Sequence, residues 1–166
     1  MGVKYKVDSN FIPEIKANMK SMKARTVTIG ALEGESAWLA GIHEYGCEIR
    51  VTPKMRAYLH GQGLHLKDST TVIKIPERSF LRSTFDSEND RIMKQTERAI
   101  GQVASGAMSV DDMLDLCGQQ FATAIKGKIV EISSPPNHPY TVEQKGSSNP
   151  LVDTGGLVES ITWKVE

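Results

Sequence analysis

The sequence lacks an excess of charge of either sign. Its 166 residues include 20 Lys and Arg and 20 Asp and Glu, so the formal net charge at neutral pH is zero. Proteins that bind nucleic acid or anionic membranes through a general positive field are basic, and this chain has no such field. We therefore expect any partner to be recognised through shape and local pairing of charges.

Cysteines and long apolar runs are also scarce. Cys47 and Cys117 are the two cysteines, and they lie far apart without CxxC or CxxxC spacing. This spacing excludes a disulfide framework or a cysteine-based zinc site and favours buried thiols in a reducing compartment. The first ten residues, MGVKYKVDSN, lack the apolar core of a signal peptide, and no run reaches membrane-spanning length. The sequence therefore predicts a soluble protein with no membrane partner.

The motifs of common enzyme classes are missing as well. The many serines include no GxSxG elbow, and no Cys–His pair has support in the sequence. HGQGLH and DTGGL match neither the GxxxxGK[ST] loop nor the GxGxxG turn that bind phosphates. In DTGGL we expect Asp153 or Thr154 to cap a short helix instead. We predict no catalytic residue, no cofactor and no enzymatic activity.

The histidines do not form a recognisable metal motif. His43 precedes Glu44, but position 47 is Cys, so the HExxH pattern of metalloproteases is incomplete and a structural or surface histidine is favoured. His60 and His65 are five residues apart, and no third or fourth ligand is obvious. We predict no metal site. A metal-dependent enzyme that uses these three histidines and Glu44 is the weakest alternative, and metal analysis of the purified protein would test it.

Apolar periodicity predicts three elements before residue 47. Residues 8–25 have helical spacing, with Ser9 as the cap. One face of this helix would comprise Phe11, Ile15, Met19 and Met22. Residues 26–32 alternate as in a half-buried strand, and a short amphipathic helix is expected from about Ser36 to Gly46. Its apolar side would comprise Trp38, Leu39, Ile42 and Tyr45.

Residues 47–76 have the pattern of an arm. CEIRV and STTVIKI look like strands, and PKMRAYLHGQG between them looks like one short helix followed by a Gly-containing excursion. Two strands that bracket such a segment predict a hairpin-like arm that projects from the body of the protein with few core contacts.

The second half of the chain is predicted to contain two long helices and a final strand. Residues 76–106 and 109–132 both have amphipathic helical patterns, with Ser109 as a cap and Asp112 three residues on. The short link makes these helices antiparallel neighbours. Residues 133–152 are rich in Pro, Ser and Gly and predict an extended loop. ESITWKV restores strand alternation, so the loop is anchored at both ends and is a good contact surface.

These elements predict an α+β fold in a single domain, residues 1–166. We expect a small, mainly antiparallel sheet packed against two long antiparallel helices, with the 47–76 arm projecting and the 133–152 loop preceding the C-terminal strand.

Four segments together carry a resemblance to a known family. They are AGIHEYG, VTPKMRAYLHGQGL, IPERSFLRSTFD and PPNHPYTVEQKGSSNPLVDTGGLVESITWKV. In this order they resemble neck and tail-completion proteins of long-tailed bacteriophages, including the virion morphogenesis proteins of Mu-like phages, over roughly residues 25–165.

The resemblance implies a structural virion protein without catalytic chemistry. Such a protein would be made in the host bacterial cytoplasm and would form a homo-oligomeric ring, expected to be a hexamer, at the neck or tail terminus. Its partners would be copies of itself, the head connector or adaptor, and the tail tube or tail terminator protein. Genome DNA would be contacted at most transiently in the channel.

The resemblance also suggests which residues meet partners. IPERSFLR looks like the strand-to-helix junction of the family and KGSSNPLVDTG, from Lys145 to Gly155, like its loop, so Lys145 and Asp153 are interface candidates. Arg78 and Arg82 would be free for carboxylates of neighbouring subunits. The candidate centre of an arm contact is Met55, Tyr58 and Leu59, with Arg56 at its rim.

Two alternatives stay open at this point. The apolar arm residues would equally well fold back on their own domain, since a short arm buries little surface alone. The basic and aromatic residues of KMRAYLHGQGLHLK would also suit stacking on single-stranded nucleic acid, so the second hypothesis is a small module that binds nucleic acid in the neck channel. A steep loss of DNA binding with added salt would favour that module.

Overall fold

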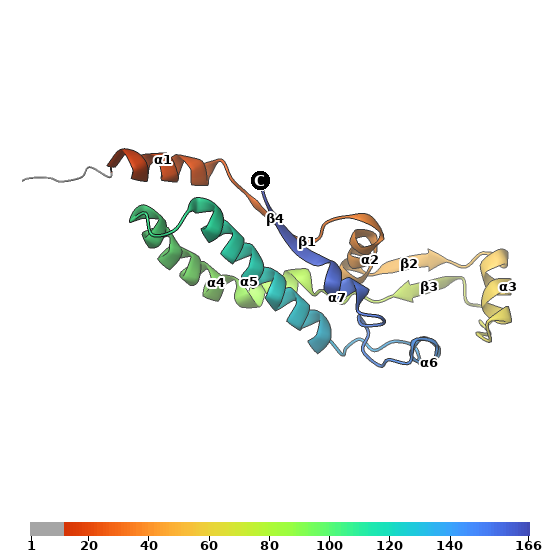
Figure 1. Ribbon diagram of the computed structural model, residues 1–166. Helices are drawn as coiled ribbons and strands as arrows, with labels where there is room; N and C mark the ends of the chain where they lie inside the picture. The colour runs from red at the N-terminus through yellow and green to blue at the C-terminus, as the bar shows by residue number, and fades with distance from the viewer. Residues whose placement is uncertain (1–11) are drawn as a thin grey trace, which may run out of the picture.

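The computed structural model describes residues 12–166, which form an elongated molecule with α1 at one end and an arm at the other (Figure 1). The helices are α1 (Ile12–Lys23), α2 (Gly34–Tyr45), α3 (Pro53–Gly61), α4 (Leu81–Ala104), α5 (Val110–Glu131), α6 (Pro139–Lys145) and α7 (Gly156–Ser160). The strands are β1 (Val27–Ala31), β2 (Cys47–Arg50), β3 (Val72–Ile75) and β4 (Ile161–Val165).

The core lies between the two long helices and a two-stranded sheet. Helices α4 and α5 pack against each other, and β1 and β4 pair antiparallel and lie against α5. The register places Val27 opposite Val165 and Ala31 opposite Ile161. One cluster of buried residues joins α5 and β4 to α2, to α7 and to the residues just before α4 and α7: Ala40, Phe80, Ala122, Ile125, Ile129, Leu151, Leu157 and Ile161. The fold is α+β with a small antiparallel sheet on two long helices, as the sequence predicts.

The start of α5 confirms the predicted cap. The backbone N–H of Asp112 donates to Ser109 Oγ at 3.0 Å, and the Ser109 hydroxyl donates to Asp112 Oδ2 at 2.7 Å. This reciprocal pair satisfies an orphan amide of the first turn and holds the carboxylate near the positive end of the helix. The capping pair fixes the start of α5 directly after the short link, and α5 packs against α4.

Two predicted apolar faces are less buried than their patterns indicate. No residue of α1 is buried, and Met22 alone among its apolar residues packs against the small cluster where α4 and α5 meet. The predicted cap Ser9 and the apolar Phe11 lie outside the described residues. In α2 the buried side chains are Ala40 and Glu44, whereas Trp38 and Tyr45 are 67% and 68% exposed.

The segment after α5 is not the structureless loop that the sequence predicts. It contains the seven-residue helix α6, which begins at Pro139, a position where the missing N–H of proline is tolerated.

The predicted cap of α7 is wrong. Gly155 occupies the cap position with φ of 92°, and neither Asp153 nor Thr154 donates or accepts a capping bond there.

Candidate functional site: the arm, its base and the adjoining loop

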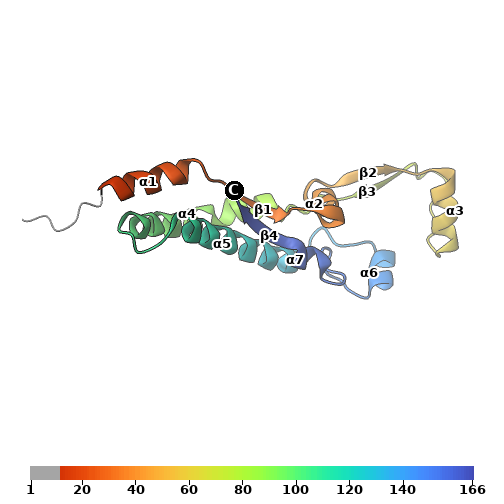
Figure 2. The same ribbon diagram turned by 45° about the horizontal axis from the view of Figure 1, so that its top comes forward.

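The arm is a two-stranded ribbon that carries a helix across its far end (Figure 2). Strands β2 and β3 pair antiparallel, with Cys47 opposite Ile75 and Arg50 opposite Val72. Across the ribbon, Lys74 Nζ lies 2.7 Å from Glu48 Oε1. No residue of β2, α3 or β3 is buried, so the arm stands outside the core, as predicted.

Local bonds shape the tip of the arm. Thr52 Oγ1 accepts from the N–H of Met55 at 3.2 Å, and Pro53 opens α3. Tyr58 is 65% exposed, and Met55 and Leu59 are half-buried. The three lie on a helix that does not pack on the body in either view, so the alternative in which they fold back onto their own domain is not what the structure shows (Figures 1 and 2).

Arg56 has a different role from the predicted rim residue. Its guanidinium donates to the carbonyl oxygens of Leu66, Lys67 and Thr70 at distances from 2.6 to 3.1 Å. A planar fork with several donors suits several carbonyls at once. Arg56 therefore fastens the segment that returns from α3 to β3 and is occupied within its own chain.

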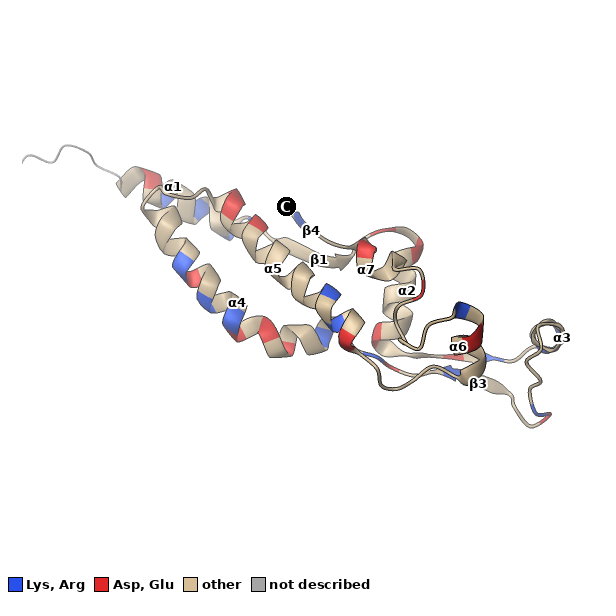
Figure 3. Cartoon of the chain, turned by 60° about the horizontal axis from the view of Figure 1, so that its bottom comes forward, with Lys and Arg blue, Asp and Glu red and all other residues tan. Residues whose placement is uncertain are grey.

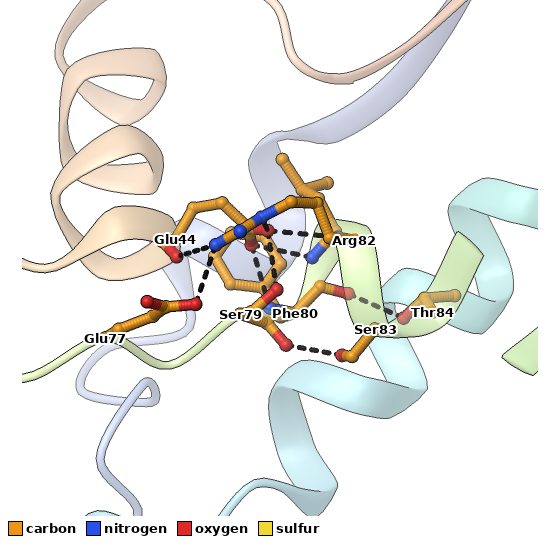
Figure 4. A network of polar contacts seen from close by, with 8 residues as sticks. Glu44, Glu77, Ser79, Phe80, Arg82, Ser83 and Thr84 are labelled. Atoms are coloured by element: carbon orange, nitrogen blue, oxygen red, sulfur yellow. Dashed lines mark hydrogen bonds and ion pairs between the residues drawn. The ribbon is translucent and has the colours of Figure 1, made fainter. Parts of the chain in front are cut away.

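A buried carboxylate joins the arm to the body. Glu44, at the end of α2, is 1% exposed and faces the first turn of α4 (Figure 4). Its two oxygens accept from the N–H groups of Phe80, Leu81 and Arg82 at 2.8 to 3.0 Å. The Ser79 hydroxyl donates to Oε1 at 2.7 Å. Glu44 thus caps α4 from another helix, in place of the local cap that the sequence there lacks.

Arg82 completes this network. The resemblance suggests that Arg82 is free to meet a neighbouring subunit, but its guanidinium is bonded within its own chain. Its Nε donates to Glu44 Oε1 at 2.9 Å, and its Nη2 donates to Glu44 O and to Glu77 Oε1, both at 2.8 Å. The guanidinium carbon lies 4.7 Å from the centre of the Tyr45 ring. These bonds, led by the one to Glu44, raise the pKa of Arg82. The side chain serves the junction between α2, β3 and α4.

Burial and bonding act in opposite directions on Glu44. Burial alone would raise the pKa of its carboxyl, but the donors from Arg82, Leu81 and Ser79 outweigh burial and lower it. Next to it, burial lowers the pKa of His43, and the charges of Arg78 and Lys145 lower it further. A charged Glu44 beside a neutral His43 is therefore the stable state of this junction near neutral pH.

Arg78 links the junction to the 133–152 loop and is likewise not free. It is 4% exposed, and its guanidinium donates to Pro135 O at 2.7 Å and to Pro136 O and Asn137 Oδ1 at 3.1 Å. Its own N–H donates to His43 O at 2.8 Å. Burial lowers the pKa of Arg78, and the carbonyl acceptors offset part of that cost. The loop is held to the body by this residue.

The remaining loop candidates separate into an internal and an exposed residue. Lys145 Nζ donates to Asn149 O at 2.6 Å and to Val152 O at 2.9 Å, and burial lowers its pKa. It stabilises the turn of its own loop rather than being free for a partner. Asp153 is exposed and remains available. From α6, the Tyr140 hydroxyl donates to Gln62 O at 3.2 Å, which joins loop and arm.

The histidines do not converge on one site. His43 and Glu44 lie at the base of the arm, whereas His60 and His65 pair near its tip with ring centres 4.3 Å apart. The alternative that combined all four residues is therefore wrong. Residues 12–166 contain no group of three or more potential metal-ligating side chains. No helix in the same range is long and apolar enough to cross a membrane.

One exposed feature was not identified as a contact surface from the sequence. Trp38 and Leu39 of α2 border a hollow of about 230 Å³ whose other wall is formed by Leu151, Thr154 and Leu157. Helical spacing marks Trp38 as part of an apolar face, but spacing alone does not reveal that nothing in the described chain covers it. An uncovered tryptophan on a rigid helix is the kind of side chain that anchors protein interfaces.

Comparison of the chain with protein-family models, with curated proteins and with solved structures found no match in any of the three. The resemblance to phage neck and tail-completion proteins therefore rests on the quoted sequence blocks alone.

Proposed function

We propose that the protein is a structural component of a tailed-bacteriophage virion and forms a homo-oligomeric ring at the neck or tail terminus that joins the tail to the head. The single observation that carries the proposal is the arm, which leaves the core entirely and presents an exposed Tyr58 at its end. A projection of this kind buries little within its own chain. Its apolar side chains gain most by meeting another protein surface.

The base of the arm supports an assembly role because it is rigid. Glu44 receives bonds from Ser79, Phe80, Leu81 and Arg82 and fixes the end of α2 to the start of α4. Since β2 follows α2 and β3 precedes α4, these bonds set the direction in which both strands leave the body. An arm held in one direction loses less entropy on docking than a flexible loop.

Ring formation fits a molecule whose ends differ. Contacts between copies of one chain that join two different surfaces are heterologous, and they close into rings or continue as filaments. In a hexameric ring the arms would contact neighbouring copies, and the helical end would be free for the connector or adaptor, or for the tail tube or terminator protein. Balanced charge, with 20 residues of each sign, allows complementary edges without a general attraction to DNA.

The test begins in the phage that encodes the chain. A deletion should yield heads lacking tails, or separate heads and tails, in electron micrographs, and a plasmid copy should restore joined particles. A copy with Tyr58→Ser and Leu59→Ser should yield soluble protein that does not restore joining. Val130→Ser changes an equally exposed apolar residue on α5 and serves as the matched control, which should restore it.

Three results would contradict the proposal. Joined, infectious particles from the deletion would remove any role in head–tail joining. Insoluble Tyr58→Ser, Leu59→Ser protein would show that these side chains stabilise their own domain. Tight DNA binding by the purified protein that weakens steeply with salt would favour the nucleic-acid module instead.

A further inference from the structure

The hollow beside Trp38 is both apolar and acidic. Trp38, Leu39, Leu151 and Leu157 supply apolar walls, and Glu35 and Asp153 stand on its border. Figure 3 shows further acidic residues where α2 begins and on α7. These are Glu33 and Glu159.

Little positive charge balances this edge. None of these four carboxylates forms a salt bridge with another residue in the range 12–166. The charges of Asp153 and Glu33 act on Lys145 and Lys164, but Lys145 already donates to two carbonyl groups of its own loop and Lys164 pairs with Glu166. The hollow therefore suits an apolar group that is flanked by cations.

The tip of the arm has the opposite character. The arm, residues 47–76, contains five basic and two acidic side chains, an excess of three positive charges in a chain whose net charge is zero. Arg50, Lys54 and Lys67 form no salt bridge with any described residue. Lys54 lies one helical turn before the exposed Tyr58 on α3.

An arm cannot reach the hollow of its own molecule. Gly46 joins α2 directly to β2, and the ribbon then extends away from α2, so that α3 lies at the far end (Figures 1 and 2). The strand and its two following residues span about 20 Å at the usual rise of a β-strand. The surface that the tip fits must therefore belong to another molecule.

We infer that the arm tip of one copy docks into the Trp38 hollow of the next copy. Tyr58, with Met55 and Leu59 beside it, would fill the apolar walls, and Lys54 and Arg50 would face Glu35 and Asp153. The inference rests on the proposed function in taking a second copy of the chain as the partner. When each copy offers its arm to one neighbour and its hollow to another, the contact is heterologous, and repetition of it generates a ring or a filament.

Charge distinguishes this hollow from a second apolar groove. That groove, of about 380 Å³, lies between β1 and α4 and is lined by Ile29, Phe85 and Phe121, among others. Arg82 and Asp86 both border it, so it has no net sign and offers no attraction to a basic arm. The charged residues that border the Trp38 hollow, Glu35 and Asp153, are both carboxylates.

The size of the contact predicts how assembly behaves. A few side chains of one short helix bury much less than the roughly 1,200 Å² of a stable interface. One arm in one hollow is therefore a weak pair, and stability comes from closing the ring, where every copy makes the contact twice. Assembly should accordingly rise steeply with protein concentration.

Disulfide trapping between two differently marked copies tests the inference. In a background with Cys47→Ser and Cys117→Ser, one preparation carries Gln62→Cys, one turn after Tyr58, and the other carries Ser36→Cys at the hollow. Mixed under mild oxidation, they should form a linked heterodimer. The matched control replaces Ser36→Cys by Asp86→Cys at the second groove, where the yield should be several-fold lower.

Charge reversal adds an independent readout. Lys54→Glu in the arm copy should lower the yield about tenfold, because a repulsion replaces an attraction of similar size. Glu35→Lys in the hollow copy should restore it. The inference would be overturned if Asp86→Cys gave as much linked product as Ser36→Cys, or if Glu35→Lys did not restore the yield. It would also be overturned if no linked product formed at concentrations at which light scattering shows oligomers, or if the protein stayed monomeric at every concentration.

The outcomes for the two proposals are separable. Efficient, charge-dependent linking together with joined particles from the deletion phage would keep the docking and reject the role in head–tail joining. Unjoined heads and tails from the deletion, with no linking through Ser36→Cys, would keep that role and reject the docking.

Discussion

The indole of Trp163 lies directly on the backbone of Gly118, so that a Cβ at position 118 would stand 2.4 Å from Cδ1 of the tryptophan. The same indole donates from Nε1 to Asp115 Oδ1 at 2.6 Å. The two contacts hold β4 against α5 at the point where the C-terminal strand completes the sheet. The close approach requires that residue 118 has no side chain.

Gly118→Ala should destabilise the protein even though alanine is the better helix former. At a contact of 2.4 Å, overpacking against a ring that cannot turn away costs about 2–3 kcal/mol, which exceeds the gain of about 1 kcal/mol in helix propensity. We expect a net loss of about 1–2 kcal/mol in urea unfolding. Gly127→Ala is the control on the same helix, with nothing within 4 Å of its added Cβ. That variant should be more stable than the wild type, and equal losses at both positions would contradict the packing argument.

Gly46→Ala tests the turn between α2 and the arm. Gly46 has φ of +70°, and an added Cβ would lie 2.8 Å from Ile75 O and 2.9 Å from Glu77 N, backbone atoms that cannot move aside cheaply. Gly34 has nearly the same φ, +67°, with open space around it. Gly46 combines this φ with ψ of 170°, a region that costs alanine about 1–3 kcal/mol, and the clash adds about 1–3 kcal/mol. The midpoint temperature of thermal unfolding should therefore fall clearly more in Gly46→Ala than in Gly34→Ala.

The elements that the sequence predicts well are those with a local signal. The helical spacing of α4 and α5, the Ser109 cap and the alternation of β4 are each written within one stretch of chain, and the structure confirms them. The arm was found in the same way, from two strand patterns around a helix that Pro53 opens.

The parts that escaped prediction depend on distant partners. Glu44 looks like a surface acid beside a histidine, and its partners lie 35 to 38 residues further on. Arg78 is held by carbonyl oxygens, which every residue has, so no side-chain pattern marks its burial. Trp38 is exposed because no other described element packs over its side of α2, and a helical pattern does not show which side of a helix is covered.

Glu44→Gln should be more disruptive than its isosteric shape indicates. A neutral amide offers one acceptor oxygen, and its NH₂ group would face backbone N–H groups that are themselves donors. Water can still solvate the partly exposed Arg82 when its carboxylate partner is gone, which limits the cost. We therefore expect the free energy of unfolding in urea to fall by about 2–3 kcal/mol. The control is Glu48→Gln, which removes the exposed pair with Lys74 and should change stability by less than about 0.5 kcal/mol. Similar losses for both variants would show that Glu44 is not the organising residue of the junction.

The same carboxylate predicts an acid-sensitive step in stability. The pKa of Glu44 in the folded protein lies below its ordinary value of 4.5, so the unfolded chain takes up a proton first as pH falls. Its stabilising contribution is complete above about pH 4.5 and is lost as pH falls through the lowered folded pKa. The difference in unfolding free energy between wild type and Glu44→Gln should therefore be constant near neutral pH and shrink in acid. A difference that does not depend on pH would contradict this.

His43 adds a step at higher pH with the same sign. Its pKa in the folded state lies below 6.5, chiefly because it is buried and also because Arg78 and Lys145 are near. The unfolded chain therefore binds the proton more readily, and stability falls as pH drops below about 6.5. In His43→Asn this first decline should disappear while the Glu44 step at lower pH remains. Unfolding midpoints measured across both pH ranges separate the two groups.

Arg56→Lys should loosen the arm tip without unfolding the body. One ammonium cannot reach the carbonyls of Leu66, Lys67 and Thr70 in the way that the guanidinium fork does. The amides of the return segment, such as that of Thr70, should then exchange hydrogen several-fold faster, while α4 and α5 keep their protection because the arm lies outside the core. Lys54→Arg, on the same helix, should leave exchange unchanged. If docking depends on a preformed tip, disulfide trapping through Gln62→Cys should weaken in step with the faster exchange, because the ordering entropy must then be supplied on binding.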